Sequence, residues 1–144
     1  MLDLIIKNGQ CYINGELKDV DVAIKDGKIQ QIGQILDEAK EILNAKELTV
    51  LPGCIDTQTH FREPGSTDTE DLHSGSRAAI VGGITSVFEM PNTNPPTSTK
   101  TEFQRKLNLA KNRMYCNYAF YFGATADNSN ELADLKSLEG CCGI

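Results

Sequence analysis

The chain has 144 residues, of which 40% are apolar and 24% charged, and its net charge is −6. This composition is typical of a globular protein, and its acidic balance argues against nucleic acid or an anionic membrane as a partner. No apolar run approaches the roughly 20 residues of a membrane span, and five cysteines without Cys-x-x-Cys spacing favour free thiols in the cytoplasm.

Residues 1–50 are predicted to form short strands separated by turns. Residues 19–24 alternate with a period of two, and a second strand-like run covers residues 28–33. The Asp26-Gly27 pair between them is a strong signal for a tight hairpin. We therefore expect a β-rich domain in this part of the chain.

From Leu51 onward the pattern changes to strands that alternate with helices. The strands are expected to begin near four positions: Pro52, Thr85, Cys116 and Cys141. Three successive strand–helix–strand units imply a parallel sheet with crossover helices. This rhythm is shared by barrels and by open doubly wound sheets, so it does not by itself decide between them.

Capping patterns predict where the helices begin. Thr67 and Thr99 each precede a glutamate by three residues, which indicates capping boxes at the first two helices. The third helix is expected from Asn128 to Gly140. The basic residues of the second helix and the segment after it are expected on a solvated face: Lys100, Arg105, Lys106, Lys111 and Arg113.

A cluster of polar residues follows the first strand of the second half. Alternation along that strand puts Asp56, Gln58 and His60 on one face, and Arg62 continues it. His60 is the best candidate for a metal ligand, because neutral imidazole is a common ligand of zinc. His73 is expected to be solvated.

Asn92 follows the next strand, directly after Met90 and Pro91. Adjacent strand ends would bring it close to Arg62, whose planar guanidinium matches a carboxylate. The pair could therefore bind an anionic substrate, with residues 63–65 forming a turn that directs Arg62. Alternatively, Arg62 is a solvated side chain and Asn92 a turn residue between prolines.

Two of these stretches resemble motifs of dihydroorotases, in the cyclic amidohydrolase superfamily. Residues 56–65 resemble their Asp-x-His-x-His-x-Arg-Glu-Pro-Gly signature (class I-like), except that Gln58 stands where the first histidine would be, and residues 90–95 match their Met-Pro-Asn-Thr-x-Pro motif. The resemblance implies an α/β protein. Residues 51–144 would be the N-terminal part of a (β/α)8 TIM barrel, and residues 1–50 part of a small β-sandwich before it.

The resemblance also implies an activity. Dihydroorotases reversibly hydrolyse the ring amide of (S)-dihydroorotate, or close N-carbamoyl-L-aspartate, in pyrimidine biosynthesis. In this chain His60 and Gln58 would bind one or two zinc ions, and Asp56 would brace them through hydrogen bonds. Arg62 and Asn92 would bind the substrate carboxylate.

The resemblance places the catalytic residues and the remaining metal ligands after Ile144. We therefore expect the 144-residue chain to be inactive alone and to associate with the C-terminal remainder of the same protein.

The replacement of a histidine by Gln58 leaves alternatives open. An amide oxygen is a poorer zinc ligand than imidazole, so the site could hold two metals weakly, hold one, or hold none. Gln58 could also be a buried amide that bonds to its neighbours. The alternative functions are a hydantoinase or allantoinase, and a catalytically eroded structural partner of aspartate transcarbamoylase. A homo-oligomer is also possible.

Overall fold

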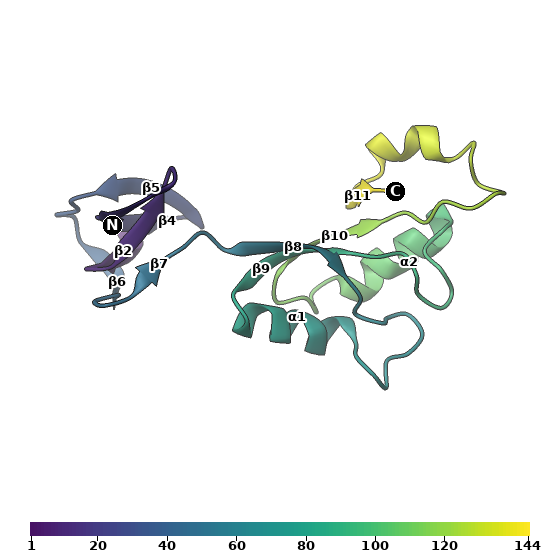
Figure 1. Cartoon of the computed structure of the whole chain (residues 1–144), viewed down its shortest axis with the longest axis horizontal. Helices are drawn as coiled ribbons and strands as arrows, with labels where there is room; N and C mark the ends of the chain where they lie inside the picture. Colours follow the sequence, from purple (N-terminus) through teal and green to yellow (C-terminus); the bar gives the residue numbers. More distant parts are fainter. The chain divides into compact units, whose positions relative to one another are not determined.

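The protein is described by a computed structural model of all 144 residues, which form two compact units, Met1–Pro52 and Gly53–Ile144 (Figure 1). No helix in either unit has both the length and the apolar character needed to cross a membrane.

The first unit consists of two small sheets. The four-stranded sheet has the order β5-β4-β1-β6, with β1 and β6 parallel and the other neighbours antiparallel. The three-stranded sheet has the order β3-β2-β7. The strands are β1 (Leu2–Lys7), β2 (Gln10–Ile13), β3 (Glu16–Asp19), β4 (Asp21–Lys25), β5 (Lys28–Gly33), β6 (Ala39–Asn44) and β7 (Thr49–Val50).

The hairpin expected at Asp26-Gly27 is present between β4 and β5. Both turn residues have positive φ, +51° and +71°, as a type I′ turn requires. Asn14-Gly15 makes a second turn of this kind between β2 and β3, with φ of +52° and +89°. A small core, built around Ile5 and Ala23, holds the four-stranded sheet together.

The second unit contains one parallel sheet with the strand order β11-β10-β9-β8. Each strand therefore pairs with the strand that precedes or follows it in the sequence. This is the strand order of a barrel wall. In a doubly wound sheet, by contrast, the strand order reverses at one point of the sheet. The strands are β8 (Cys54–Thr59), β9 (Ile84–Glu89), β10 (Asn117–Tyr121) and β11 (Cys141–Gly143).

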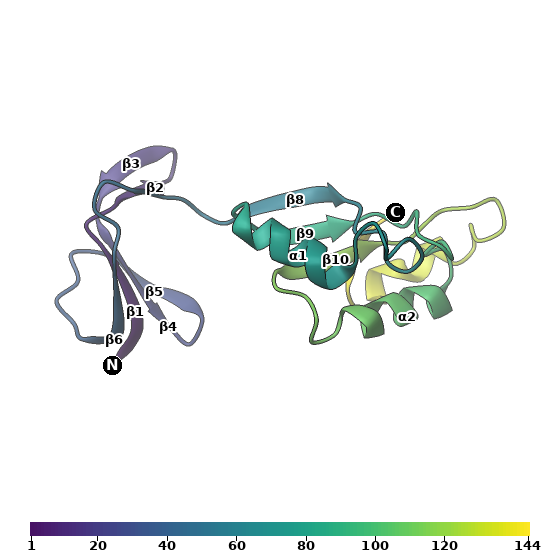
Figure 2. The same cartoon turned by 90° about the horizontal axis from the view of Figure 1, so that it is seen from below.

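The crossover helices lie on one side of this sheet, as the two views in Figures 1 and 2 show. They are α1 (Leu72–Val81) and α2 (Lys100–Ala110), and a short 3-10 helix, η1 (Leu132–Ser137), precedes β11. Phe103, Phe120 and Phe122 are fully buried at the centre of the core between the sheet and the helices. The expected α/β class is therefore confirmed.

Two expectations about the helices are wrong. Helix α1 is capped by Asp71 and not by Thr67, because the Asp71 carboxylate accepts a hydrogen bond from the Ser74 backbone N–H at 2.6 Å. The third helix is only the six-residue η1, and Asn128 does not begin it. Its amide donates to the carbonyls of Ser98 and Gly123, both at 2.8 Å, and so ties two loops together.

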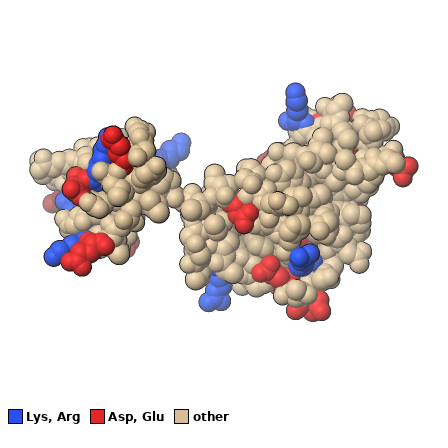
Figure 3. All heavy atoms as spheres, viewed as in Figure 1, with Lys and Arg blue, Asp and Glu red and all other residues tan.

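The surface shown in Figure 3 carries acidic and basic side chains that are scattered and separated by wide uncharged areas. No single-sign patch dominates this face, which agrees with the modest net charge of −6. The cysteines are free thiols: Cys11, Cys54, Cys116, Cys141 and Cys142.

Candidate active site

The carboxyl ends of β8 and β9 bring two of the predicted site residues together. His60 directly follows β8, Asn92 lies in the loop after β9, and His60 Nδ1 is 2.8 Å from Asn92 Oδ1. Because an amide oxygen can only accept a hydrogen bond, the ring donates from Nδ1. In the neutral form of this tautomer, the other ring nitrogen, Nε2, carries the lone pair that can bind a ligand.

Arg62 follows His60 by two residues and has an exposed side chain. Its guanidinium forms no ion pair in the structure, and no hydrogen bond joins it to Asn92. The backbone of Arg62 has φ of +61°, in the left-handed region that non-glycine residues seldom adopt. The structure thus brings Asn92 to His60, whereas the Arg62 guanidinium has no protein partner.

Asp56 and Gln58 are both exposed on β8. The Asp56 carboxylate accepts a hydrogen bond from the backbone N–H of Gln58 at 3.0 Å, and the pairing of β8 with β9 is irregular between Asp56 and Thr59. The Gln58 side chain is therefore not a buried amide. The roles of both residues in metal binding stay predictions.

A metal site is not complete within this chain. No group of three His, Cys, Asp or Glu side chains is arranged to hold a metal ion, whereas a catalytic zinc takes three protein ligands beside its water. His60 fits one such position, because its Nε2 is free while Nδ1 is held by Asn92. The residues present thus provide one imidazole and not a full ligand set.

A buried ion pair supports the end of β9. Glu89 contacts Lys106 of α2, and their side chains are 1% and 0% exposed. Lys106 Nζ also donates to the Met90 carbonyl at 3.1 Å and lies 5.0 Å from the centre of the Phe120 ring. Burial raises the pKa of Glu89 and lowers the pKa of Lys106. In both residues this effect of burial opposes the attraction of the partner charge, which favours the charged forms.

The solvated position expected for Lys106 is therefore wrong. Lys106 lies three residues after Phe103 and four before Ala110, and these are the buried residues of α2. That spacing places all three on one helical stripe. It is the signal in the sequence that could have identified Lys106 as a buried charge.

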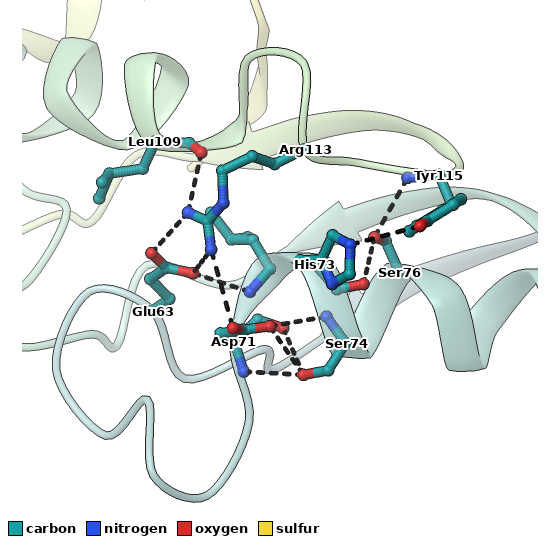
Figure 4. Close-up of polar contacts among 9 residues, drawn as sticks. Glu63, Asp71, His73, Ser74, Ser76, Leu109, Arg113 and Tyr115 are labelled. Carbon is teal, nitrogen blue, oxygen red and sulfur yellow. Dashed lines mark hydrogen bonds and ion pairs between the residues drawn. The ribbon is translucent and has the colours of Figure 1, made fainter.

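Arg113 was expected on a solvated face, but it is only partly exposed and has a carboxylate partner. It lies after α2 and forms two hydrogen bonds with Glu63, at 2.7 and 3.1 Å, as Figure 4 shows. His73 is exposed, as expected, and its ring meets Tyr115 edge to face. Glu63 was expected only to form a turn, so its buried carboxylate is a feature that the sequence did not reveal.

The singly wound parallel sheet and the polar residues at its carboxyl edge define the second unit as part of a βα-barrel domain. In such barrels the active site is built at the carboxyl ends of the strands. His60 and Asn92 follow two adjacent strands at this edge.

Comparisons with known proteins agree with this class. The amidohydrolase family profile matches residues 49–140. Allantoinase from Escherichia coli O1:K1 is 42% identical over 137 residues, which cover 94% of this chain and 30% of that protein. L-hydantoinase (dihydropyrimidinase) from Arthrobacter aurescens has a TM-score of 0.90 at 31% identity, over 99% of this chain and 32% of that one. D-hydantoinase from Bacillus sp. AR9 has a TM-score of 0.81 at 26% identity, over 96% of this chain and 32% of that one.

The chain belongs to the amidohydrolase family. It spans about a third of the length of these relatives, and the fold is that of the N-terminal part of an amidohydrolase barrel. The family is generally metal-dependent. Because these relatives are an allantoinase and hydantoinases, the narrower dihydroorotase assignment stays a prediction.

Proposed function

We propose that this chain provides the first strand ends of an active site that hydrolyses an amide bond in a small nitrogen-containing ring, with an allantoin-type ring as the first candidate. The observation that carries the proposal is the 42% identity with E. coli allantoinase across 94% of the chain. The placement of His60 and Asn92 at adjacent strand ends supports it.

His60 would act as one metal ligand through Nε2, while its hydrogen bond to Asn92 keeps the ring in the required tautomer. A bound zinc ion would lower the pKa of a water molecule and polarise a carbonyl group. Gln58 is a weaker candidate ligand, and the remaining ligands and the proton-transferring carboxylate would come from residues outside this sequence.

Arg62 would bind the substrate. Its side chain is exposed and has no carboxylate partner, and it lies two residues after His60 in the sequence. It can donate two parallel hydrogen bonds to a carboxylate, or donate to a ring carbonyl. In both cases it would orient the ring so that the scissile amide faces the hydrolytic centre.

The free Arg62 also favours a second candidate, the dihydroorotase activity that the sequence motifs resemble. Dihydroorotate carries a carboxylate on its ring, whereas allantoin does not. A guanidinium without an acidic partner is the group that would distinguish these two rings. The two candidate functions therefore differ in the group that Arg62 would bind, which is a carboxylate in dihydroorotate and a ring carbonyl in allantoin.

Turnover of allantoin, hydantoin and dihydroorotate by the complete protein tests the proposal, with zinc content measured alongside. We expect kcat/KM to be highest for allantoin. A preference of about tenfold or more for dihydroorotate would replace the first candidate by the second. Absence of turnover on every ring would refute both and favour a structural partner, such as a non-catalytic companion of aspartate transcarbamoylase.

Arg62→Met separates the candidates further. A bound carboxylate substrate would cover the Arg62 guanidinium, and removing one partner of a charged contact that is buried on binding costs about 2–5 kcal/mol, which is a loss of about thirtyfold or more in kcat/KM. We expect a loss of that size on dihydroorotate and a smaller one on allantoin. Zinc content should be unchanged. Arg77→Met, at an exposed position of α1, is the matched control, and equal losses in both variants would exclude substrate binding by Arg62.

A further inference from the structure

The glutamate next to Arg62 is buried and fully hydrogen-bonded, although Arg62 itself is exposed. Glu63 is 7% exposed. Its Oε1 accepts a hydrogen bond from Arg113 Nη1 at 2.7 Å, and its Oε2 accepts from Arg113 Nη2 at 3.1 Å and from the Leu72 backbone N–H at 2.9 Å. Figure 4 shows this fork-to-fork contact, which we call the Glu63–Arg113 clamp.

The clamp joins three segments of the second unit. Glu63 belongs to the loop after β8, Leu72 is the first residue of α1, and Arg113 follows α2, fifty positions from Glu63. Arg113 Nη1 also donates to the Leu109 carbonyl at 3.0 Å, which holds the guanidinium against the end of α2. A bidentate contact of this kind fixes direction as well as distance.

Contacts on both sides of Arg62 leave its backbone little freedom. His60 is held by Asn92 at 2.8 Å, and the Pro64 carbonyl accepts a hydrogen bond from the Asn94 N–H at 2.9 Å. Between these contacts Arg62 adopts φ of +61°. A non-glycine residue keeps such a conformation only where its surroundings enforce it. The clamp, with the buried Glu63 carboxylate and the partly exposed Arg113 guanidinium, is the charged part of those surroundings.

We propose that Glu63 and Arg113 are positioning residues, which hold the left-handed backbone of Arg62 so that its guanidinium is directed at the substrate oxygen. This inference rests on the proposed function, because it takes Arg62 to bind the ring substrate. Neither Glu63 nor Arg113 touches the substrate. Their effect is transmitted through the backbone of a single neighbouring residue.

A double-mutant cycle in the complete protein tests the positioning role. Glu63→Gln keeps the size of the side chain and removes its charge. We expect it to raise KM by about tenfold on the ring that the wild type prefers, with kcat changed by less than about threefold. In an Arg62→Met background the same change should leave KM unaltered, because the positioned group is already absent.

Equal effects of Glu63→Gln on KM in both backgrounds would overturn the proposal, since a general loss of structure does not depend on Arg62. Arg113→Lys is the second variant if Glu63→Gln folds poorly, because it keeps the charge and loses the fork. We expect it to raise KM less than Glu63→Gln does. No change in KM in either variant would also overturn the proposal.

Limited trypsin digestion gives a readout that does not depend on turnover. Trypsin cleaves after arginine, and Arg113→Lys weakens the clamp without altering the Arg62–Glu63 bond that trypsin would cut. We therefore expect cleavage after Arg62 to be faster in Arg113→Lys than in wild type, by about threefold or more, with cleavage after Arg77 unchanged. If no ring is hydrolysed by the wild type but this acceleration occurs, the proposed function fails and the clamp stands. If cleavage after Arg62 is unchanged, the clamp fails regardless of activity.

Discussion

The ion pair between Glu89 and Lys106 leads to the sharpest prediction about stability. Both side chains are almost fully buried, so replacing Lys106 by methionine would leave a carboxylate without a countercharge in the core. Breaking a buried pair in this way costs about 3–5 kcal/mol. Lys106→Met also removes the hydrogen bond to the Met90 carbonyl, two residues before Asn92. We therefore expect the free energy of unfolding to fall by that amount.

Two further variants make this prediction specific. In Glu89→Leu/Lys106→Met both charges are gone. Apolar residues of similar volume often replace a buried ion pair without loss of stability, so this double variant should be as stable as wild type or slightly more stable. Lys111→Met, at an exposed position at the end of α2, should change stability by less than about 0.5 kcal/mol. Urea unfolding of the complete protein, followed by circular dichroism, provides the measurement.

The single variant should also respond to pH. The pKa of Glu89 is raised by burial, so the folded state binds the proton more tightly than the unfolded chain does. The resulting contribution to stability is present below the unfolded pKa and is lost as the pH rises through the folded pKa. Lys106→Met removes the opposing attraction and raises that pKa further. The loss of unfolding free energy in this variant, relative to wild type, should therefore be smaller at about pH 5 than at about pH 8.

Three outcomes would refute this reasoning. The free energy of unfolding of Lys106→Met could lie within about 0.5 kcal/mol of the wild-type value. This would mean that Glu89 is not left buried and unpaired in the variant. The double variant could lose as much stability as the single one, which would mean that packing of the lysine stem matters more than charge. The loss of stability in Lys106→Met could become larger at low pH, which would contradict the raised pKa of Glu89.

Two remaining predictions concern the site and its support. Gln58→His should tighten zinc binding in the complete protein, because imidazole is a better zinc ligand than an amide; unchanged zinc affinity in a competition titration with a chelator would exclude position 58 as a ligand. Gly75→Val should destabilise the protein by about 1–3 kcal/mol, because a Cβ at Gly75 would lie 2.4 Å from the Phe61 ring. Gly82→Ala is its control, since the nearest atom there is 3.4 Å away, and similar unfolding midpoints for the two variants would contradict the packing argument.

Much of the fold follows from local patterns. The Asp26-Gly27 hairpin, the four parallel strands and the start of α2 at Thr99 agree with the sequence, because turns, caps and alternation depend on residues a few positions apart. The order of β8 and β9 also puts His60 and Asn92 at one edge. Their metal-binding and substrate-binding roles stay predictions that only the complete protein can test.

The expectation that Lys106 and Arg113 lie on a solvated face was wrong. The helical spacing of Lys106 places it on the buried stripe of α2, but the sequence does not show that its partner is Glu89. Nor does it show that Arg113 is bonded to Glu63, fifty residues away. Whether a charge is solvated or paired depends on which distant carboxylate the fold brings to it. The sequence by itself therefore determined the strands, the turns and the polar strand ends, whereas the tertiary structure alone decided which charges are buried and how Arg62 is held.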